Sequence, residues 1–258
     1  MRTKIGSLSV ELVRAEAARF QRPLLFLHGL WTDASIWQAW AGYLSHRGWE
    51  SWAPALFGDP EYAEHERVVD AARTLLAALP EPPIIVTHDL GIVAALELVH
   101  AITAPAIVAV APVVAAADGG RLGVLRFPRF WRARFGATDV AAPTGALGRT
   151  LIGRSSGVSM RSDSGAIFRA LVGDRLRLAP PVPVPGLVVG GAEDVLTPPA
   201  AVHSLAERQD WPHEIHADRG HFPMIEPGWE QVADGVHRWI VRAMGEEILA
   251  WLDDEEEP

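Results

Sequence analysis

The five residues Thr87-His88-Asp89-Leu90-Gly91 form the most informative segment of the chain. An apolar run at 83–86 precedes them and a stretch of small and apolar residues at 92–98 follows, so the pattern predicts a strand, a sharp turn and a helix. That order is typical of a nucleophile elbow, in which the residue at the tip is presented for attack and is usually serine. Here the tip is Asp89, and a carboxylate can attack a carbon that carries a leaving group, forming an alkyl–enzyme ester.

Two further residues follow in an order that suits such a nucleophile. Asp194 comes shortly after an apolar run at 186–190, and His221 lies in a Gly-His loop before the last helical stretch. A histidine placed there can act as a general base, and an acid can orient its ring. Glu193 is the competing acid, but the spacing to Pro198 favours Asp194.

The remaining pattern predicts the scaffold that would bring these residues together. Short apolar runs alternate with helical spacing, which indicates an α/β fold with a mostly parallel central sheet and helices on both faces. Polar groups that follow the strands should then gather at the carboxyl ends of the sheet. We expect strands at 8–15, 23–27, 49–56, 84–87, 106–110, 186–190 and 214–217, and helices at 36–44, 62–79, 92–101 and 229–251.

The pattern changes between residues 114 and 180, where glycines, prolines and arginines interrupt it. Helices are plausible there near 125–135 and 165–171. We expect a core in two parts, 1–114 and 184–258, with a small lid insert at 115–183 over the strand ends.

Together with the His28-Gly29 turn, these motifs resemble the α/β-hydrolase superfamily over nearly the whole chain. The resemblance is carried by the elbow at 87–91, by the segment 190–198 and by Gly220-His221-Phe222-Pro223. An aspartate at the tip resembles the haloalkane dehalogenases, haloacid-type dehalogenases and epoxide hydrolases, whose elbow often reads G-H-D-x-G. This chain departs from that pattern by having Thr87 in place of the first glycine.

The resemblance implies a mechanism in two steps. Asp89 would attack a saturated carbon, and the backbone N–H groups of Leu30 and Leu90 would hold the oxygen of the resulting ester. His221, held by Asp194, would then activate a water molecule that hydrolyses the ester. No metal or organic cofactor is implied, and the expected partners are a small apolar substrate and water.

The leaving group stays open between a halide and an epoxide oxygen. Epoxide hydrolases usually provide tyrosines from the lid, whereas Tyr43 and Tyr62 lie outside it here. Dehalogenases commonly carry tryptophan after the nucleophile, whereas this chain has Leu90. Trp31, after the His-Gly turn, and Trp131, in the insert, are the tryptophans whose indole N–H groups would bind a departing halide.

The composition of the chain limits the binding partners and the cellular compartment that we expect for it. The chain has 258 residues, enough for one α/β domain, and a net charge of -9, which argues against a nucleic-acid partner. It has no cysteine, so disulfides and thiolate sites are excluded. It shows neither a hydrophobic signal segment nor an apolar run long enough to span a membrane. We expect a cytoplasmic protein without membrane contact; its oligomeric state is not indicated.

Two other functions, from classes other than the hydrolases, also fit these motifs. One is a scaffold that only binds a ligand without covalent chemistry, although a pure binder has no need of Asp194 and His221. The other is a cofactor-free lyase or isomerase in which His221 is the base and Asp89 a bystander. A covalent adduct on Asp89 would distinguish the hydrolase from both.

Overall fold

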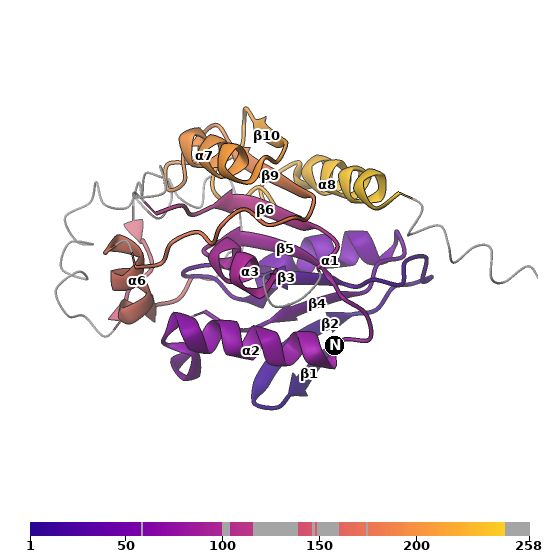
Figure 1. The fold of residues 1–258 in the computed structure, drawn as a ribbon, viewed down its shortest axis with the longest axis horizontal. Coiled ribbons are helices and arrows are strands. Elements are labelled where there is room, and N and C mark those ends of the chain that lie inside the picture. The colour runs from indigo at the N-terminus through magenta and orange to yellow at the C-terminus, as the bar shows by residue number, and fades with distance from the viewer. Residues whose placement is uncertain are drawn as a thin grey trace, which may run out of the picture.

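The computed structural model describes residues 1–57, 59–99, 104–115, 139–145, 148, 160–173 and 175–245, and within them an eight-stranded sheet forms the centre (Figure 1). The strands lie in the order β1-β2-β4-β3-β5-β6-β9-β10. The neighbours from β4 to β10 are parallel, while β1 and β2 form an antiparallel hairpin that pairs with β4. The strands are β1 (Arg2–Ile5), β2 (Leu8–Val13), β3 (Leu24–Leu27), β4 (Ser51–Pro54), β5 (Ile84–Asp89), β6 (Ile107–Pro112), β9 (Gly186–Gly191) and β10 (His213–His216).

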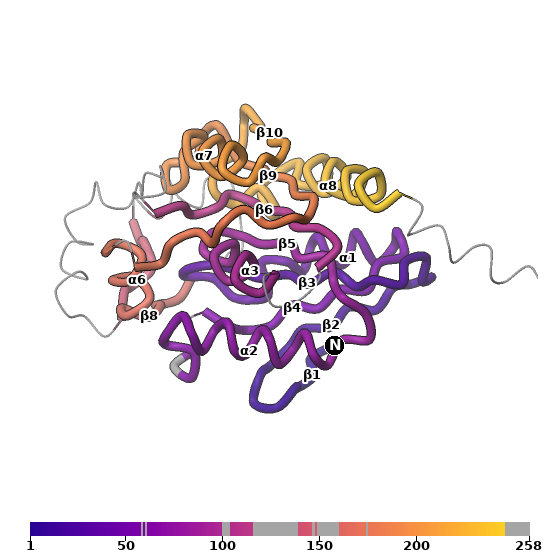
Figure 2. Tube along the Cα trace, viewed as in Figure 1, coloured from indigo at the N-terminus to yellow at the C-terminus, as the bar shows by residue number. Residues whose placement is uncertain are grey.

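Helices cover both faces of this sheet, and the chain trace in Figure 2 shows how they surround the strands. The 3-10 turns are η1 (Ala34–Trp37) and η2 (Pro60–Tyr62), and the helices of the core are α1 (Gln38–Ser45), α2 (His65–Ala78), α3 (Gly91–Val99), α7 (Pro199–Gln209) and α8 (Trp229–Met244). The expected α/β class, with a mostly parallel sheet between helices, is therefore confirmed.

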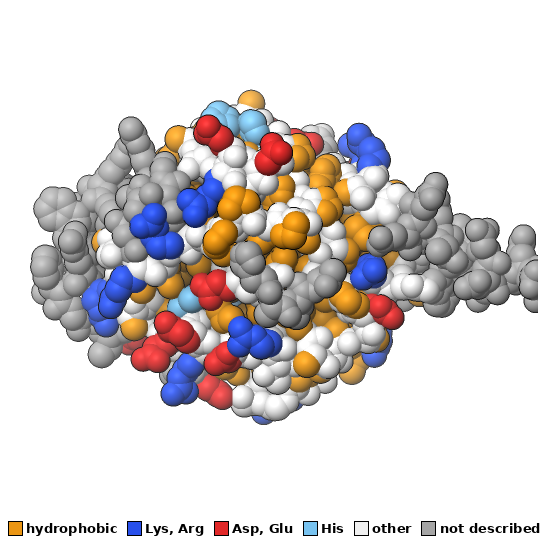
Figure 3. Space-filling view, viewed as in Figure 1, with side chains coloured by type: hydrophobic (Ala, Val, Ile, Leu, Met, Phe, Trp, Pro, Cys, Tyr) orange, Lys and Arg blue, Asp and Glu red, His pale blue; other side chains and the backbone are white. Residues whose placement is uncertain are grey.

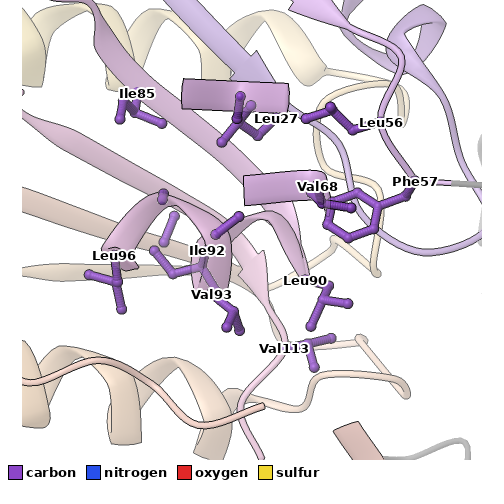
Figure 4. Close-up of a cluster of buried hydrophobic side chains, with 14 of the residues drawn as sticks. Leu27, Leu56, Phe57, Val68, Ile85, Leu90, Ile92, Val93, Leu96 and Val113 are labelled. Atoms are coloured by element: carbon purple, nitrogen blue, oxygen red, sulfur yellow. The ribbon is translucent and has the colours of Figure 1, made fainter. Parts of the chain in front are cut away.

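The core has two halves because successive side chains of a strand point to opposite faces. In β5, Ile85 belongs to the apolar cluster under α2, α3 and α7, whereas Ile84 and Val86 belong to the cluster under α1 and α8. Figure 4 shows the first cluster, with Leu96 of α3 among its labelled side chains. A central strand that is buried on both faces explains why its sequence is continuously apolar rather than alternating.

The expected elements are mostly present, but their ends differ. The last strand and the last helix begin within one residue of expectation, and the stretch expected as one helix at 62–79 is η2 followed by α2. Helix α7 was not expected from the sequence, because its apolar side of Val202 and Leu205 is short and Pro198 and Pro199 open it. The expected helix at 125–135 and the end of 229–251 lie outside the described residues.

Part of the insert between β6 and β9 is described. It contains a two-stranded ribbon of β7 (Asp139–Val140) and β8 (Asp163–Ser164), followed directly by α6 (Gly165–Val172). In Figure 1 these elements lie at one end of the sheet. Helix α6 matches the expected helix at 165–171. The division into 1–114, 115–183 and 184–258 stays a prediction.

The surface in view carries charges of both signs. Arginines and acidic residues are interspersed over α2, whose sequence contains Glu66, Arg67, Asp70 and Arg73 (Figure 3). Within the described residues, no helix combines the length and apolarity that crossing a bilayer requires.

Candidate active site

The elbow expected at residues 87–91 is present. Strand β5 ends at Asp89, where the backbone has φ +54°, and α3 begins at Gly91. Such a conformation costs a non-glycine residue about 1–3 kcal/mol and persists where the surroundings enforce it. Neighbouring backbone is tightly packed, because a Cβ on Gly29 would lie 2.4 Å from Asp89 Cβ and one on Gly91 2.8 Å from the Leu27 carbonyl oxygen. Thr87 is accommodated in the strand and is fully buried.

The Asp89 carboxylate is fully buried and only partly satisfied. Its Oδ2 accepts a hydrogen bond from the Leu30 N–H at 2.9 Å, while its Oδ1 has no hydrogen-bond partner among the described residues. Burial raises the pKa of Asp89 to about 7, although the charge of His221 and the bond from Leu30 act in the opposite direction. This side chain is therefore held close to the boundary between its acid and its carboxylate form at neutral pH.

His221 faces Asp89 and is oriented from behind by Asp194. Its Nε2 lies 4.0 Å from Asp89 Oδ2, and its Nδ1 lies 2.9 Å from Asp194 Oδ2. Burial lowers the pKa of His221, but the charges of Asp194 and Asp89 and the hydrogen bond to Asp194 outweigh it, so the pKa is raised overall. Of the two acids weighed from the sequence, Asp194 makes this contact and Glu193 is exposed.

Asp194 is itself fixed by the loop that follows it. Its Oδ1 accepts hydrogen bonds from the backbone N–H groups of Leu196 and Thr197, both at 2.8 Å, and its Oδ2 accepts one from the Thr197 hydroxyl at 2.6 Å. Three donors hold this carboxylate in one orientation, which suits an acid that orients a histidine ring.

Two buried histidines brace the backbone on either side of the site. His28 donates from Nδ1 to the Gly29 carbonyl and accepts at Nε2 from the Leu56 N–H, each at 3.1 Å. Burial lowers its pKa to about 4, so the ring is neutral. Burial lowers the pKa of His88, and its Nε2 lies 3.0 Å from the His221 carbonyl oxygen. His88 therefore holds the loop that carries the candidate base.

Glu226 is a residue that the sequence did not single out. It is buried, and its carboxylate accepts hydrogen bonds from the backbone N–H groups of Gly220 at 2.8 Å and Phe222 at 3.2 Å. These two peptides flank His221, so Glu226 fixes the turn that presents the ring. The only signal in the sequence is an acid five residues after the histidine, which is too common to be informative.

The expected oxyanion and leaving-group residues have different surroundings. The Leu30 N–H points at Asp89, whereas an oxyanion role for the Leu90 N–H stays a prediction; the Leu90 side chain packs in the core (Figure 4). The Trp31 indole N–H donates to the Val140 carbonyl at 3.1 Å, so binding a halide would require that bond to be exchanged. Trp131 lies outside the described residues.

Both tyrosines of the chain are engaged elsewhere. Tyr43 donates to Asp234 at the contact between α1 and α8, and the Tyr62 hydroxyl lies 3.3 Å from that of Ser7 near β2. Neither hydroxyl can protonate a leaving group beside Asp89 from these positions.

Three residues of the candidate site have atoms that can bind a metal ion. One such atom each of His88, Asp89 and His221 lies within 4.8 Å of the others. His88 Nε2 contacts the His221 carbonyl and His221 Nδ1 contacts Asp194, which orients the His221 ring toward Asp89.

Comparisons with known proteins agree with this architecture. A family model described as alpha/beta hydrolase family matches residues 24–234. Among solved structures, a monoglyceride lipase from Saccharomyces cerevisiae has a TM-score of 0.71 at 12% identity, covering 94% of each chain. A thermophilic esterase from Thermogutta terrifontis has a TM-score of 0.66 at 17% identity, covering 95% of this chain and 100% of its own. A monoacylglycerol lipase from Paleococcus ferrophilus has a TM-score of 0.69 at 17% identity, with coverages of 92% and 99%. Among curated proteins, no significant match was found.

Proposed function

This chain belongs to the alpha/beta hydrolase family, and from that premise we propose that it is a hydrolase whose nucleophile is the Asp89 carboxylate. The single observation that carries the proposal is the placement of Asp89 at the tip of the elbow, 4.0 Å from a histidine that an acid orients. The substrate class that fits is a small apolar molecule with a saturated carbon bearing a halide or an epoxide oxygen.

In the first step, ionised Asp89 attacks the substrate carbon through Oδ1, the oxygen that lacks a partner among the described residues. The new carbon–oxygen bond forms as the bond to the leaving atom breaks. A halide departs with the electron pair, whereas an epoxide oxygen stays on the substrate as an alkoxide and takes a proton from solvent. Oδ2 then becomes the carbonyl oxygen of the ester, already held by the Leu30 N–H. Donors fixed before reaction stabilise developing charge without reorganisation.

Esterification also changes His221. The negative charge of Asp89 is one of the causes that raise the pKa of His221, so neutralising Asp89 lowers that pKa again. His221 can then take a proton from water. A water molecule within hydrogen-bond distance of both atoms, which lie 4.0 Å apart, would be placed for this proton transfer.

In the second step, the hydroxide equivalent attacks Asp89 Cγ, and the Leu30 N–H stabilises the tetrahedral oxyanion. The bond between Cγ and Oδ1 breaks, so Oδ1 leaves with the alcohol and takes the proton that His221 had removed from water. Asp89 now carries one oxygen from water and the remaining proton, which it releases to solvent to regenerate the carboxylate. Esters fit this route poorly, because carboxylate attack on an acyl carbon yields an anhydride.

The test is to trap the intermediate in a His221→Gln variant incubated with a panel of haloalkanes, epoxides and simple esters. We expect a mass increase on the peptide that contains Asp89, equal to the alkyl group, while the wild type turns the same compound over. His46→Gln, at a histidine whose side chain is 65% exposed, is the matched control and should not accumulate an adduct.

Three outcomes separate the alternatives. Release of halide by the wild type identifies a halide as the leaving group, and formation of a diol identifies an epoxide oxygen. Turnover by the wild type without any adduct on Asp89 in the variant would rule out covalent catalysis and favour the lyase or isomerase reading. Binding without turnover would favour a ligand-binding scaffold.

A further inference from the structure

Three hydrogen bonds join Trp31 to described residues of the insert between β6 and β9. Its backbone N–H donates to Asp163 Oδ2 at 3.0 Å, its carbonyl accepts from the Arg161 N–H at 3.0 Å, and its indole N–H donates to the Val140 carbonyl at 3.1 Å. The residue is 2% exposed and has φ +60°, a conformation that a bulky side chain adopts only under constraint. The insert therefore fixes the backbone of Trp31 directly.

The residue before Trp31 is Leu30, whose N–H is the donor to Asp89. Fixing both ends and the side chain of Trp31 leaves little freedom in the torsions that aim the Leu30 N–H. The 2.9 Å contact between that N–H and Asp89 Oδ2 thus depends on elements more than a hundred residues away in the sequence. The sequence showed no sign of this dependence.

Asp163 is the polar side chain at the centre of this contact. It is 2% exposed, its Oδ1 accepts from the Ser164 N–H at 2.7 Å, and Ser164 in turn caps α6 by accepting from Ala166. Its position is further fixed by pairing of β8 with β7, where Asp163 lies opposite Val140, the acceptor of the indole. The carboxylate is consequently anchored to a helix and a ribbon rather than to a free loop.

We propose that Asp163 is a positioning residue that aims the Leu30 N–H at the reacting carboxylate by holding the Trp31 backbone from the insert. This role deepens the proposed function, but it does not depend on the electrophile, since the Leu30 N–H would serve any oxygen that develops charge at this place.

Two substitutions of Asp163 can distinguish the effect of its charge from the effect of its hydrogen bond to Trp31. Burial is the largest cause of the raised pKa of Asp89; the charge of His221 and the Leu30 N–H lower that pKa, and the charges of Asp163 and Asp194 raise it. Replacing Asp163 with asparagine removes the charge and keeps one oxygen, which can accept from the Trp31 N–H while the bond from the Ser164 N–H is lost. Replacing it with alanine removes both the acceptor and the charge.

The experiment compares Asp163→Asn, Asp163→Ala and Asp139→Asn, the last being an exposed position on the same ribbon. We expect Asp163→Ala to lower kcat by about 10- to 100-fold with a smaller change in KM, because misaligning an oxyanion donor costs less than the 10²–10³-fold of removing one. The kcat of Asp163→Asn should stay within about threefold of the wild-type value at pH 8, and the acid limb of its pH–rate profile should move to lower pH. Asp139→Asn should behave as wild type.

Two measurements need no substrate. Amide hydrogen exchange at Trp31 should accelerate in Asp163→Ala but not in Asp163→Asn. The carbon-13 resonance of the Asp89 carboxyl, assigned by its loss in Asp89→Asn, should titrate at lower pH in Asp163→Asn than in wild type. If the panel shows only ester turnover, the proposed function fails, and the role of Asp163 is judged on that ester and on these two measurements.

The proposal is overturned if Asp163→Asn and Asp163→Ala lose activity equally, or if Asp163→Ala keeps wild-type kcat and Trp31 exchange. Rescue of kcat and of slow Trp31 exchange by asparagine, but not by alanine, supports it.

Discussion

Replacing Asp89 with asparagine should make the fold more stable at alkaline pH while abolishing covalent catalysis. Asp89 is fully buried, and burial raises its pKa from 3.8 to about 7. A change of that size corresponds to about 4 kcal/mol of cost for holding the ionised form in the folded state. Asparagine keeps an oxygen for the Leu30 N–H and carries no charge, so it removes the cost.

The sign of the pH dependence follows from proton binding. The folded state binds the Asp89 proton more tightly than the unfolded chain does, so ionisation costs nothing below about pH 4, increasingly more between pH 4 and 7, and the full amount above pH 7. Part of the gain is offset because the substitution also removes the charge that raises the pKa of His221. We therefore expect Asp89→Asn to be more stable than wild type by about 2–4 kcal/mol at pH 8 and by about 1 kcal/mol or less at pH 4.5.

The assay is urea unfolding of wild type and variant at pH 4.5 and pH 8, with the slopes compared to verify that both unfold in the same way. Asp139→Asn, at an exposed aspartate, controls for the general effect of removing one negative charge. A variant that is no more stable than wild type at pH 8, or whose gain is the same at both pH values, would refute the idea that Asp89 is a desolvated carboxylate.

Two substitutions near the site test its backbone geometry. Glu226→Gln leaves one acceptor oxygen for two backbone N–H groups. We therefore expect the free energy of unfolding in urea to fall by about 1–3 kcal/mol, and kcat to fall as well. An unchanged kcat would show that these two hydrogen bonds do not position His221. Gly29→Ala would place a Cβ 2.4 Å from Asp89 Cβ and must displace the nucleophile or its turn. We expect adduct formation on Asp89 to slow by about 100-fold or more, measured by mass spectrometry in the His221→Gln background, and wild-type kinetics would contradict the packing described for the elbow.

The sequence by itself determined the architecture and the order of the candidate catalytic residues. Continuous apolar runs such as 84–87 predict strands buried on both faces, and the turn after that run predicts the elbow at Asp89, because both signals are local. Asp194 and His221 could be placed after strands by the same local patterns, and parallel strands bring such positions to one edge of the sheet.

Tertiary structure alone decided what surrounds those residues. Glu226 beneath the His221 turn, His88 against its carbonyl and Asp163 on the Trp31 backbone act through side-chain contacts with peptide groups, which leave no periodicity or spacing in the sequence. The raised pKa of Asp89 likewise arises from its burial within the fold and not from its neighbours in the chain. Residue types and local patterns therefore fixed the candidate chemistry, whereas long-range packing set the charge and aim of the groups that would perform it.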